Sequence, residues 1–522
     1  MTTGRDYDAI VAGGGHNGLV CAGYLAKAGL KVLLLERRSF VGGAVATEEL
    51  FSGYRLSSCS YICHLLQPKI IDDFNLHQHG FEVYQLDPAR FQPYPDGRSL
   101  MLWDSVERSQ ESIAQFSRHD ADAYPKWQAF WQRAAELIYP YFLSSPPTLS
   151  ELAAKVRGTA DEQFLDRLLT TSMKDLVTEF FDSDAVRGAF IQAQDVGDPA
   201  ASGSAWCYTY IKCDMFSRPA DVGIVKGGMG SITQALADSI RTLGVTIQTD
   251  ATVEQVLIEQ GQAIGVRLQD GTDITSRIVV SNADPKQTLL KMVGEKHLPS
   301  EFFRRTTRLK TNTGYLKFHA ALSRLPDFSQ SVAEDFDPRC LANIKICPSV
   351  EYYEKSWNDA RQGRPADEPV MEIQIPSVYD PTLTAEGQHV MSIWALYAPV
   401  RLSEGTWDSR REEVAEKLID VVSRYAPDIR DCIVDRSLFT PIDIQRRVAM
   451  TDGNIRHLDM VPDQFLANRP LQGWSSYGTP VQGLYLCGAG THPGGEVSGA
   501  PGHNAAQCIL SQWQQPDSNG HP

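Results

Sequence analysis

The sequence predicts an α/β protein in which a Rossmann-like sheet is combined with a substrate domain of mixed sheet and a helical cap. Three observations lead to this prediction. Residues 7–36 read as strand, glycine turn, helix and strand, the βαβ opening of such a sheet. A helical pattern then occupies 99–220, and β-like runs follow between 301 and 400. Finally, a short apolar strand, a glycine-dense loop and a helix fill 484–513.

Length and composition indicate a folded protein of several structural units. The chain has 522 residues, which corresponds to about three units of roughly 150 residues each. Hydrophobic residues make up 42% and charged residues 22%, near the globular average and unlike disordered chains. The net charge of −15 argues against nucleic acid as a partner, because binding to a phosphate backbone requires clustered Lys and Arg.

The sequence also bears on location and redox state. No apolar run approaches the ~18 to 20 residues that a membrane-spanning helix needs. The first strand leaves no room for a signal peptide before it, so we expect a cytoplasmic protein, with peripheral contact to a membrane surface left open. Ten cysteines are scattered through the chain, and the closest pair, Cys59 and Cys63, is not a CxxC pair. We therefore expect reduced, structural thiols.

The first predicted strand, 7–12, ends in a glycine turn that fits the GxGxxG pattern. In this pattern Gly13 permits the tight turn, Gly15 lets the backbone approach a pyrophosphate, and Gly18 lets helix and strand pack closely. The N-terminus of the next helix supplies the positive end of its dipole. These residues predict a dinucleotide site.

The residues after the second strand bear on which dinucleotide is bound. Glu36 ends that strand, where a carboxylate accepts hydrogen bonds from the adenosine ribose. Arg37 and Arg38 would also suit the 2′-phosphate of NADP, so NAD(P) is the alternative. The glycine break at 41–44 favours FAD, because the ribityl chain of a flavin needs a close approach free of side chains.

A second glycine-rich segment lies near the other end of the sequence. Seven glycines fall within 483–502, so the backbone must approach something closely there. Because a helix begins just after the segment, its amides and dipole can face the flavin N1/O2 region, where negative charge appears on reduction. The two ends of the sequence therefore predict that the chain wraps one FAD.

We expect a discontinuous FAD-binding domain made of 1–98, 221–300 and 476–515, a helical cap at 99–220 and a substrate domain at 301–475. No metal site is predicted.

The predicted cap contains an aromatic-rich stretch at 124–143, with seven aromatic residues in twenty. Packing in the core of the cap is the simpler interpretation, and an apolar substrate mouth or a membrane-facing surface is the alternative. The segment 51–61 likewise predicts either the lining of a pocket or a strand.

Several segments carry a resemblance to a known family: GGGHNGLVCAGYLAKAG, ERRSFVGGAVATEE, IPSVYDPTLTAEGQH, GNIRHLDM and LYLCGAGTHPGGEVSGAPGHNAA. With these the chain resembles the carotenoid and retinoid oxidoreductases, the flavoprotein family that contains bacterial-type phytoene desaturases, within the wider amine-oxidase-like group. It looks closest to the branch with cyanobacterial-type β-carotene ketolases and pyridine nucleotide-disulfide oxidoreductase domain-containing protein 2. The resemblance implies an amine-oxidase-like fold, FAD chemistry on long apolar isoprenoids and, for a eukaryotic chain, a mitochondrial location.

Predicted cofactor contacts follow from the resemblance and from the two glycine motifs. The resemblance implies Gly13, Gly15, Gly18, Glu36, Arg37, Gly43, Ala44, Val253, Gly490 and Val497. The motifs add His16, Asn17, Gly488 and Gly495. Two residues depart from the family pattern, since Glu496 stands where a small residue is usual and His503 where Arg is usual. Both departures concern the substrate side of the predicted site.

Little acid-base machinery is needed if the flavin itself accepts the hydride. His492, Glu496 and Tyr61 are the catalytic candidates. Glu496 is expected beside the isoalloxazine, with its side chain either in solvent or facing the ring. In the second arrangement, burial and reduced flavin would raise its pKa and make it a proton donor or acceptor.

Three functions remain open. The first is an FAD-dependent desaturase, oxidase or ketolase acting on an apolar isoprenoid or polyene. The second is an FAD-dependent oxidase of another small substrate such as an amine, and the third is a flavin-binding regulatory protein with little turnover. An NADPH-dependent disulfide reductase is disfavoured, because the sequence has neither a second GxGxxG between strand and helix nor a CxxC pair.

Overall fold

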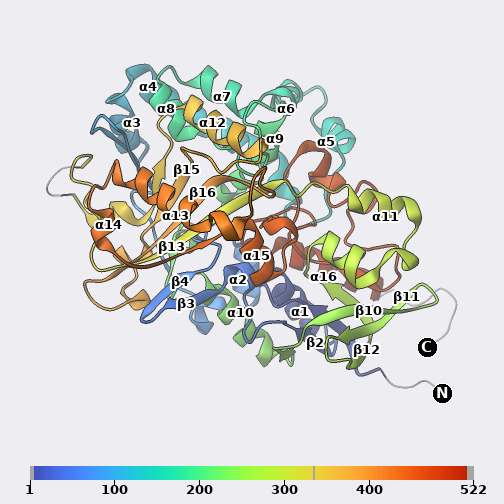
Figure 1. Ribbon diagram of the computed structural model, residues 1–522. Coiled ribbons are helices and arrows are strands. Elements are labelled where there is room, and N and C mark those ends of the chain that lie inside the picture. The colour runs from blue at the N-terminus through green and yellow to red at the C-terminus, as the bar shows by residue number, and fades with distance from the viewer. Residues whose placement is uncertain (1–4, 333–335, 514–522) are drawn as a thin grey trace.

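The computed structural model describes residues 5–332 and 336–513, which form two seven-stranded sheets with a layer of helices above them (Figure 1). The predicted cofactor domain also included residues 1–4 and 514–515, which lie outside the described residues.

The first sheet is a parallel, Rossmann-like sheet that continues into an antiparallel meander. Its parallel strands are, in spatial order, β18 (Leu484–Leu486), β12 (Asp273–Ser281), β1 (Tyr7–Ala12), β2 (Val32–Leu35) and β9 (Thr246–Gln248). The meander consists of β10 (Val253–Glu259), β11 (Gln262–Leu268) and β12. One face of the sheet packs against α1 (His16–Lys27), α10 (Gly230–Thr242) and α16 (Ala500–Trp513). β1 from Ala9 onward and all of β2 are buried, and their apolar residues pack on both faces of the sheet.

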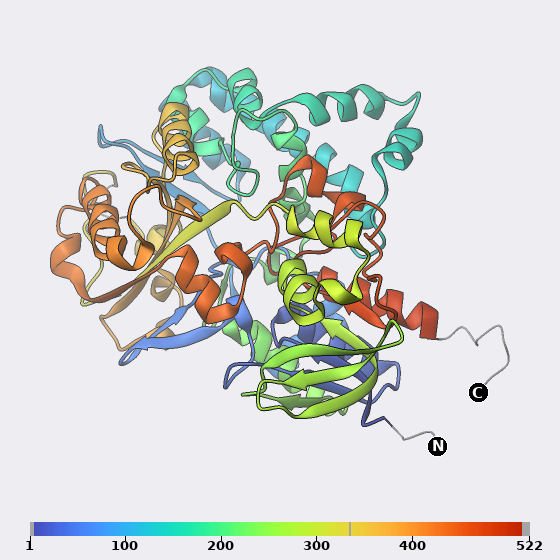
Figure 2. The ribbon, with the colours of Figure 1, turned by 45° about the vertical axis from the view of Figure 1, so that its right-hand side comes forward.

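The first and last of these helices pack against each other beside the fingerprint (Figure 2). A Cβ on Gly502 of α16 would overlap the carbonyl oxygen of Asn17 in α1, so only glycine permits this approach. The rings of Tyr24 and His503 meet edge to face, with centroids 4.9 Å apart. The two ends of the described chain therefore build one site.

The second sheet is mixed. Its strand order is β17 (Ile433–Phe439), β13 (Thr313–Leu322), β16 (His389–Pro399), β15 (Val370–Gln374), β14 (Ile344–Ile346), β6 (Arg90–Pro93) and β7 (Ser99–Leu102). One face packs against α13 (Trp407–Ser423). The predicted domain boundary at residue 98 differs from this arrangement, because it separates two paired strands, β6 and β7, of the second sheet. The pairing of β6 with the distant β14, through Phe91 and Ile344, has no local signal in the sequence.

Helices of the cap cover the other side of the second sheet (Figure 1). They are α3 (Val106–Ala114), α4 (Arg118–Ile138), α5 (Leu149–Val156), α6 (Ala160–Thr170), α7 (Met173–Phe180), α8 (Asp184–Phe190), α9 (Ser204–Tyr208) and, from later in the chain, α12 (Val350–Arg361). Trp127, Phe130 and Trp131 of α4 are buried in the core of the cap. This burial supports the core-packing interpretation of the aromatic stretch.

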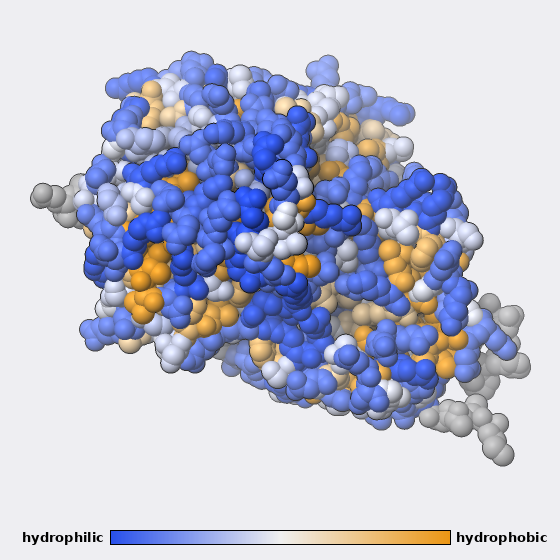
Figure 3. Space-filling model, viewed as in Figure 1, coloured by the Kyte–Doolittle hydropathy of each residue, from blue (hydrophilic) through white to orange (hydrophobic). Residues whose placement is uncertain are grey.

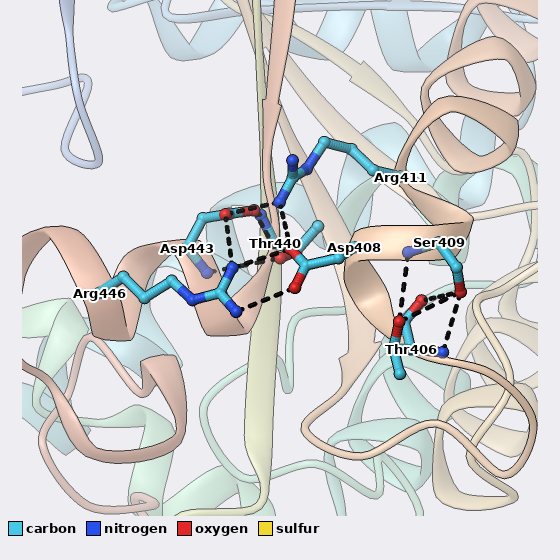
Figure 4. Close-up of polar contacts among 7 residues, drawn as sticks. All are labelled: Thr406, Asp408, Ser409, Arg411, Thr440, Asp443 and Arg446. Carbon is cyan, nitrogen blue, oxygen red and sulfur yellow. Dashed lines mark hydrogen bonds and ion pairs between the residues drawn. The ribbon is translucent and has the colours of Figure 1, made fainter.

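Charged side chains join α13 to α15 (Pro441–Val448), a helix between the second sheet and the cofactor domain (Figure 4). Arg446 donates to both carboxylate oxygens of Asp408, at 2.8 and 2.9 Å, and Arg411 donates to Asp443 at 2.7 Å. Both helices begin with a capping box, which satisfies their first backbone amides. These contacts fix the position of α15, which lines the cavity described below.

Among the described residues, no helix combines the length and the apolar character needed to cross a membrane. The face shown in Figure 3 is mostly hydrophilic, with apolar residues in small separate groups. All ten cysteines are free, and nine of them are buried, as expected for structural thiols.

Candidate active site

A cavity of about 910 Å³ extends from the fingerprint to the space between the cap and the second sheet. On the cofactor side its wall includes Gly13, Gly15, His16, Asn17, Glu36, Arg37, Gly43, Ala44, Val253, Asn282, Ala489, Glu496 and Val497. On the substrate side it includes Tyr61, Ile62, His64, Arg90, Gln192, Tyr208, Ile211, Lys212, Asp214, Glu372, Trp394 and Arg456. Of the residues selected from the sequence, Gly18, Gly488, Gly490, Gly495 and His492 lie outside this wall.

The fingerprint loop has the geometry that its glycines predict. Gly13 adopts a φ of +107°, which favours glycine, and a Cβ on Gly18 would overlap the carbonyl oxygen of Gly13. A Cβ on Gly15 would meet only one atom within 4 Å, Asn282 Nδ2 at 2.9 Å, and would otherwise enter the cavity. Glu36 accepts hydrogen bonds from the amide of Gly14 at 2.8 Å and from the amide of Arg38 at 2.9 Å, which fix its carboxylate beside the loop.

These residues fit a dinucleotide cofactor. The first turn of α1 has neither a side-chain cap nor an acidic residue, so its amides are available to a pyrophosphate. Glu36 offers carboxylate oxygens to a ribose. Within the described residues, His16 Nε2 and Asn17 Oδ1 are buried at the wall without a hydrogen-bond partner, so a bound group has polar atoms to satisfy.

The C-terminal glycine segment approaches protein rather than open space. A Cβ on Gly490 would lie 2.7 Å from Pro285 Cγ and closer still to Cδ, and a Cβ on Gly495 would overlap the side chain of Arg456. The fully buried Arg469 holds the same segment, since its guanidinium donates to the carbonyl oxygen of Ala489 at 2.7 Å. Three residues of the segment reach the cavity: Ala489, Glu496 and Val497.

Glu496 turns its side chain into the cavity from a left-handed backbone conformation, with φ of +65°. One carboxylate oxygen pairs with Nη2 of Arg456, and the other lies 3.5 Å from Nε2 of His64. Burial raises the pKa of Glu496, but Arg456 and His64 outweigh burial and lower this pKa to about 2. The raised pKa expected for an inward-facing Glu496 is therefore corrected, because no local signal in the sequence indicates that Arg456 is its neighbour.

Glu496 belongs to a continuous chain of charged groups. His64 Nδ1 lies 3.4 Å from Asp214, and Nε of Arg456 donates to Asp195 at 2.7 Å. Burial lowers the pKa of His64, but hydrogen bonds to Asp214 and Glu496 outweigh it and raise the pKa to about 9. At neutral pH, His64 is therefore a cation between two carboxylates. These charged groups link the cap to the C-terminal glycine segment.

Tyr61 lines the cavity next to Trp394, with ring centroids 6.2 Å apart and planes tilted by 45°. The ammonium of Lys317 lies 4.9 Å from the Tyr61 ring centroid. Burial raises the pKa of Tyr61 well above its usual value, so the hydroxyl keeps its proton.

His492 occupies a structural position. Its Nε2 lies 2.8 Å from the carbonyl oxygen of Tyr141, and the side chain is buried outside the cavity wall. Burial lowers its pKa to about 4, so the ring is neutral at physiological pH. This placement argues against the catalytic role considered for His492.

Several residues at the site belong to no motif that predicted a role for them: His64, Asp195, Asp214, Asn282 and Arg456. Arg456 lies within the segment GNIRHLDM, whose family resemblance was the available signal.

Comparison with known proteins identifies the family. The sequence model described as "Flavin containing amine oxidoreductase" matches residues 18–510. The chain belongs to this family. As a member of the flavin containing amine oxidoreductases it is a flavin-dependent oxidoreductase, and the predicted fold class is confirmed.

Similar proteins within this family carry different names. The chain is 34% identical to mouse "Pyridine nucleotide-disulfide oxidoreductase domain-containing protein 2", over 97% of this chain and 93% of that protein. It is 28% identical to a limonene dehydrogenase component from Castellaniella defragrans, over 99% and 98%. It is 24% identical to "Phytoene desaturase (lycopene-forming)" of Pseudescherichia vulneris, over 96% and 98%.

Solved structures of the flavin containing amine oxidoreductases also superpose on the chain. Cyclohexylamine oxidase from Brevibacterium oxydans has a TM-score of 0.59 at 16% identity, covering 98% of this chain and 100% of that one. At this identity the match supports the fold.

Proposed function

We propose that the protein binds FAD as its flavin and oxidises an isoprenoid substrate by dehydrogenation. The observation that carries the proposal is the cavity, which is continuous from the dinucleotide loop to a region walled by Tyr61, Ile62, Tyr208, Ile211 and Trp394. The likeness to relatives named for limonene dehydrogenation and phytoene desaturation supports the same chemistry.

FAD, when bound, supplies the acceptor for a hydride from a substrate carbon. The chain's own residues bind and orient the reactants: the amides of the first α1 turn and Glu36 suit the dinucleotide, and the aromatic and aliphatic wall suits an apolar substrate. Glu496 remains ionised and paired with Arg456, so it contributes charge and does not carry a proton at neutral pH.

Oxidation of a small amine is the second candidate. The two rings of Tyr61 and Trp394 on the cavity wall favour it, since aromatic faces attract cations. The nearby carboxylates Glu372 and Glu496 would add attraction, but Glu496 is already paired with Arg456.

The experiment compares substrates under anaerobic conditions. The released cofactor is identified by chromatography, and the loaded protein is then mixed with limonene, phytoene, putrescine or cyclohexylamine while the visible flavin absorbance is followed. Bleaching by an isoprenoid supports the proposal. Bleaching by amines alone would establish the second candidate, bleaching by none would favour a regulatory flavoprotein, and a cofactor other than FAD would overturn the proposal at its first step.

A further inference from the structure

The face of the second sheet that lines the cavity carries buried charges. Glu372 of β15 is directly opposite Lys345 of β14 and Trp394 of β16, so the three side chains share one face. Arg90, at the start of β6, places Nη2 3.9 Å from Glu372 Oε1. Lys345 is 1% exposed and Glu372 8%. Burying charges costs free energy, so a wall for a pure hydrocarbon does not explain them.

Two cations flank Glu372 at this end of the cavity: Arg90 lies on the wall, and Lys345 lies behind it. The ammonium of Lys345 donates to the carbonyl oxygens of Ala189 and Ile191, each at 3.0 Å, and among the described residues it reaches no carboxylate. Arg90 also contacts the carbonyl oxygen of Ala189, at 3.3 Å, and its buried Nε has no hydrogen-bond partner in the described parts of the chain. Glu372 is thus the carboxylate that faces both cations.

A third cation, Lys212, comes from the cap and lines the cavity. Its ammonium lies 5.5 Å from the centroid of the Tyr208 ring, and it forms no ion pair with any described residue. Burial lowers the pKa of Lys212, and the charge of Arg90 lowers it further; Asp214, which raises it, is paired with His64. Arg90 and Lys212, which both line the cavity, are named the cationic cluster below.

Burial also lowers the pKa of Lys345 to about 8, and Arg90 contributes to the lowering. Lys345 lies behind the cavity wall, whereas Lys212 lies on it. The protein compensates the positive charge of Lys212 poorly, and an anion bound in the cavity would stabilise it. A polar donor is also at hand, since the Tyr208 hydroxyl donates to Oε1 of Gln192 and leaves the Gln192 amide N–H groups to a ligand. Ile211 and Trp394 supply apolar surface beside these donors.

We propose that the cationic cluster binds a carboxylate, and hence that the substrate is an amphipathic acid with an apolar isoprenoid body. The proposal rests on the proposed function, because it takes the same cavity to hold the substrate. Arginine pairs with a carboxylate through parallel N–H donors, which a neutral hydrocarbon or an alcohol cannot match. A cationic amine would be repelled by the cluster.

The test uses three probes with the same C15 body: farnesoic acid, farnesol and farnesylamine. Isothermal titration of the FAD-loaded protein at neutral pH is expected to show the acid binding at least about tenfold more tightly than the alcohol, with the amine weakest. Arg90→Gln should weaken binding of the acid by about tenfold and leave the alcohol unchanged. Arg361→Gln, an exposed arginine of α12 outside the cavity wall, is the matched control and should bind all three as the parent does.

Equal binding of acid and alcohol, or preference for the amine, would overturn the proposal. If Arg90→Gln does not load FAD, Lys212→Met gives the same comparison, and an unchanged acid preference in that variant would equally overturn it. The two proposals fail separately. If the acid binds in a cluster-dependent way but no isoprenoid bleaches the flavin, the proposed dehydrogenation is wrong and the anion site stands. If isoprenoids bleach the flavin but the acid is not preferred, the dehydrogenation stands and the anion site is wrong.

Discussion

The two glycine-rich segments of the chain look alike in sequence but use glycine differently. In the fingerprint, Gly15 faces the cavity, and its missing side chain leaves room for a ligand. In the C-terminal segment, Gly490 lies against Pro285 and Gly495 against Arg456, so the missing side chains let protein meet protein. Glycine density in a sequence thus predicts close approach without identifying what approaches.

The largest expected effect is in the fingerprint. Gly15→Val should abolish flavin loading, because a branched side chain would fill the space that a pyrophosphate needs. The flavin-to-protein absorbance ratio measures this. Gly478→Ala is the control, since a Cβ there meets no atom within 4 Å and should leave the ratio unchanged. Normal flavin content in Gly15→Val would show that the missing side chain of Gly15 does not make room for the cofactor, so the two segments would not differ in this way.

Gly490→Ala should act on stability instead. Its Cβ would press on the rigid ring of Pro285, and overpacking of this kind costs about 1 to 3 kcal/mol. Denaturant unfolding should show this loss, while the folded fraction keeps its full flavin content. If the variant lost flavin without losing stability, the glycine at 490 would instead leave room for the cofactor, as Gly15 does in the fingerprint.

Glu496→Gln tests the part of the C-terminal segment that does reach the cavity. We expect normal flavin content and a reduction potential raised by roughly 30 mV, about a tenfold change in a two-electron equilibrium, because a negative charge near reduced flavin is removed. Spectroelectrochemical titration measures the shift. Glu386→Gln, an exposed residue away from the cavity, should show none. An unchanged potential in Glu496→Gln would mean that the segment does not influence the flavin.

The smallest effect concerns pH. The pKa of His64 is raised to about 9 from an ordinary 6.5, so its stabilising contribution is fully present below pH 6.5 and is lost as the pH rises through about 9. The free energy of unfolding should fall by less than about 1.4 kcal/mol between pH 7 and 8, the limit for one proton. Urea unfolding at several pH values should show this slope. His64→Gln should reduce the dependence of the free energy of unfolding on pH, and His79→Gln should leave it unchanged. An equal slope in both variants would show that His64 does not cause this dependence.

Local signals predicted the cofactor half of the fold well. The strand expected at 7–12 is β1 (Tyr7–Ala12), and the short strand and the helix expected within 484–513 are β18 (Leu484–Leu486) and α16 (Ala500–Trp513). Glycine turns and apolar periodicity predict such elements because each signal lies within a few neighbouring residues. The pairing of β6 with β14 and the chain from His64 through Glu496 to Arg456 were not predictable in this way. Both join residues that are far apart in the sequence, and the pKa of Glu496 depends entirely on such neighbours.

The packing of α16 on α1 has a consequence for the order of events during synthesis. β2 ends at Leu35, whereas β18 begins at Leu484, roughly 450 residues later. At ~5 to 20 residues per second a ribosome needs roughly 20 to 90 seconds to make that stretch. During that time the fingerprint exists without the helix and glycine segment that complete it. A nascent chain therefore acquires its full cofactor site only after α16 (Ala500–Trp513) has been made.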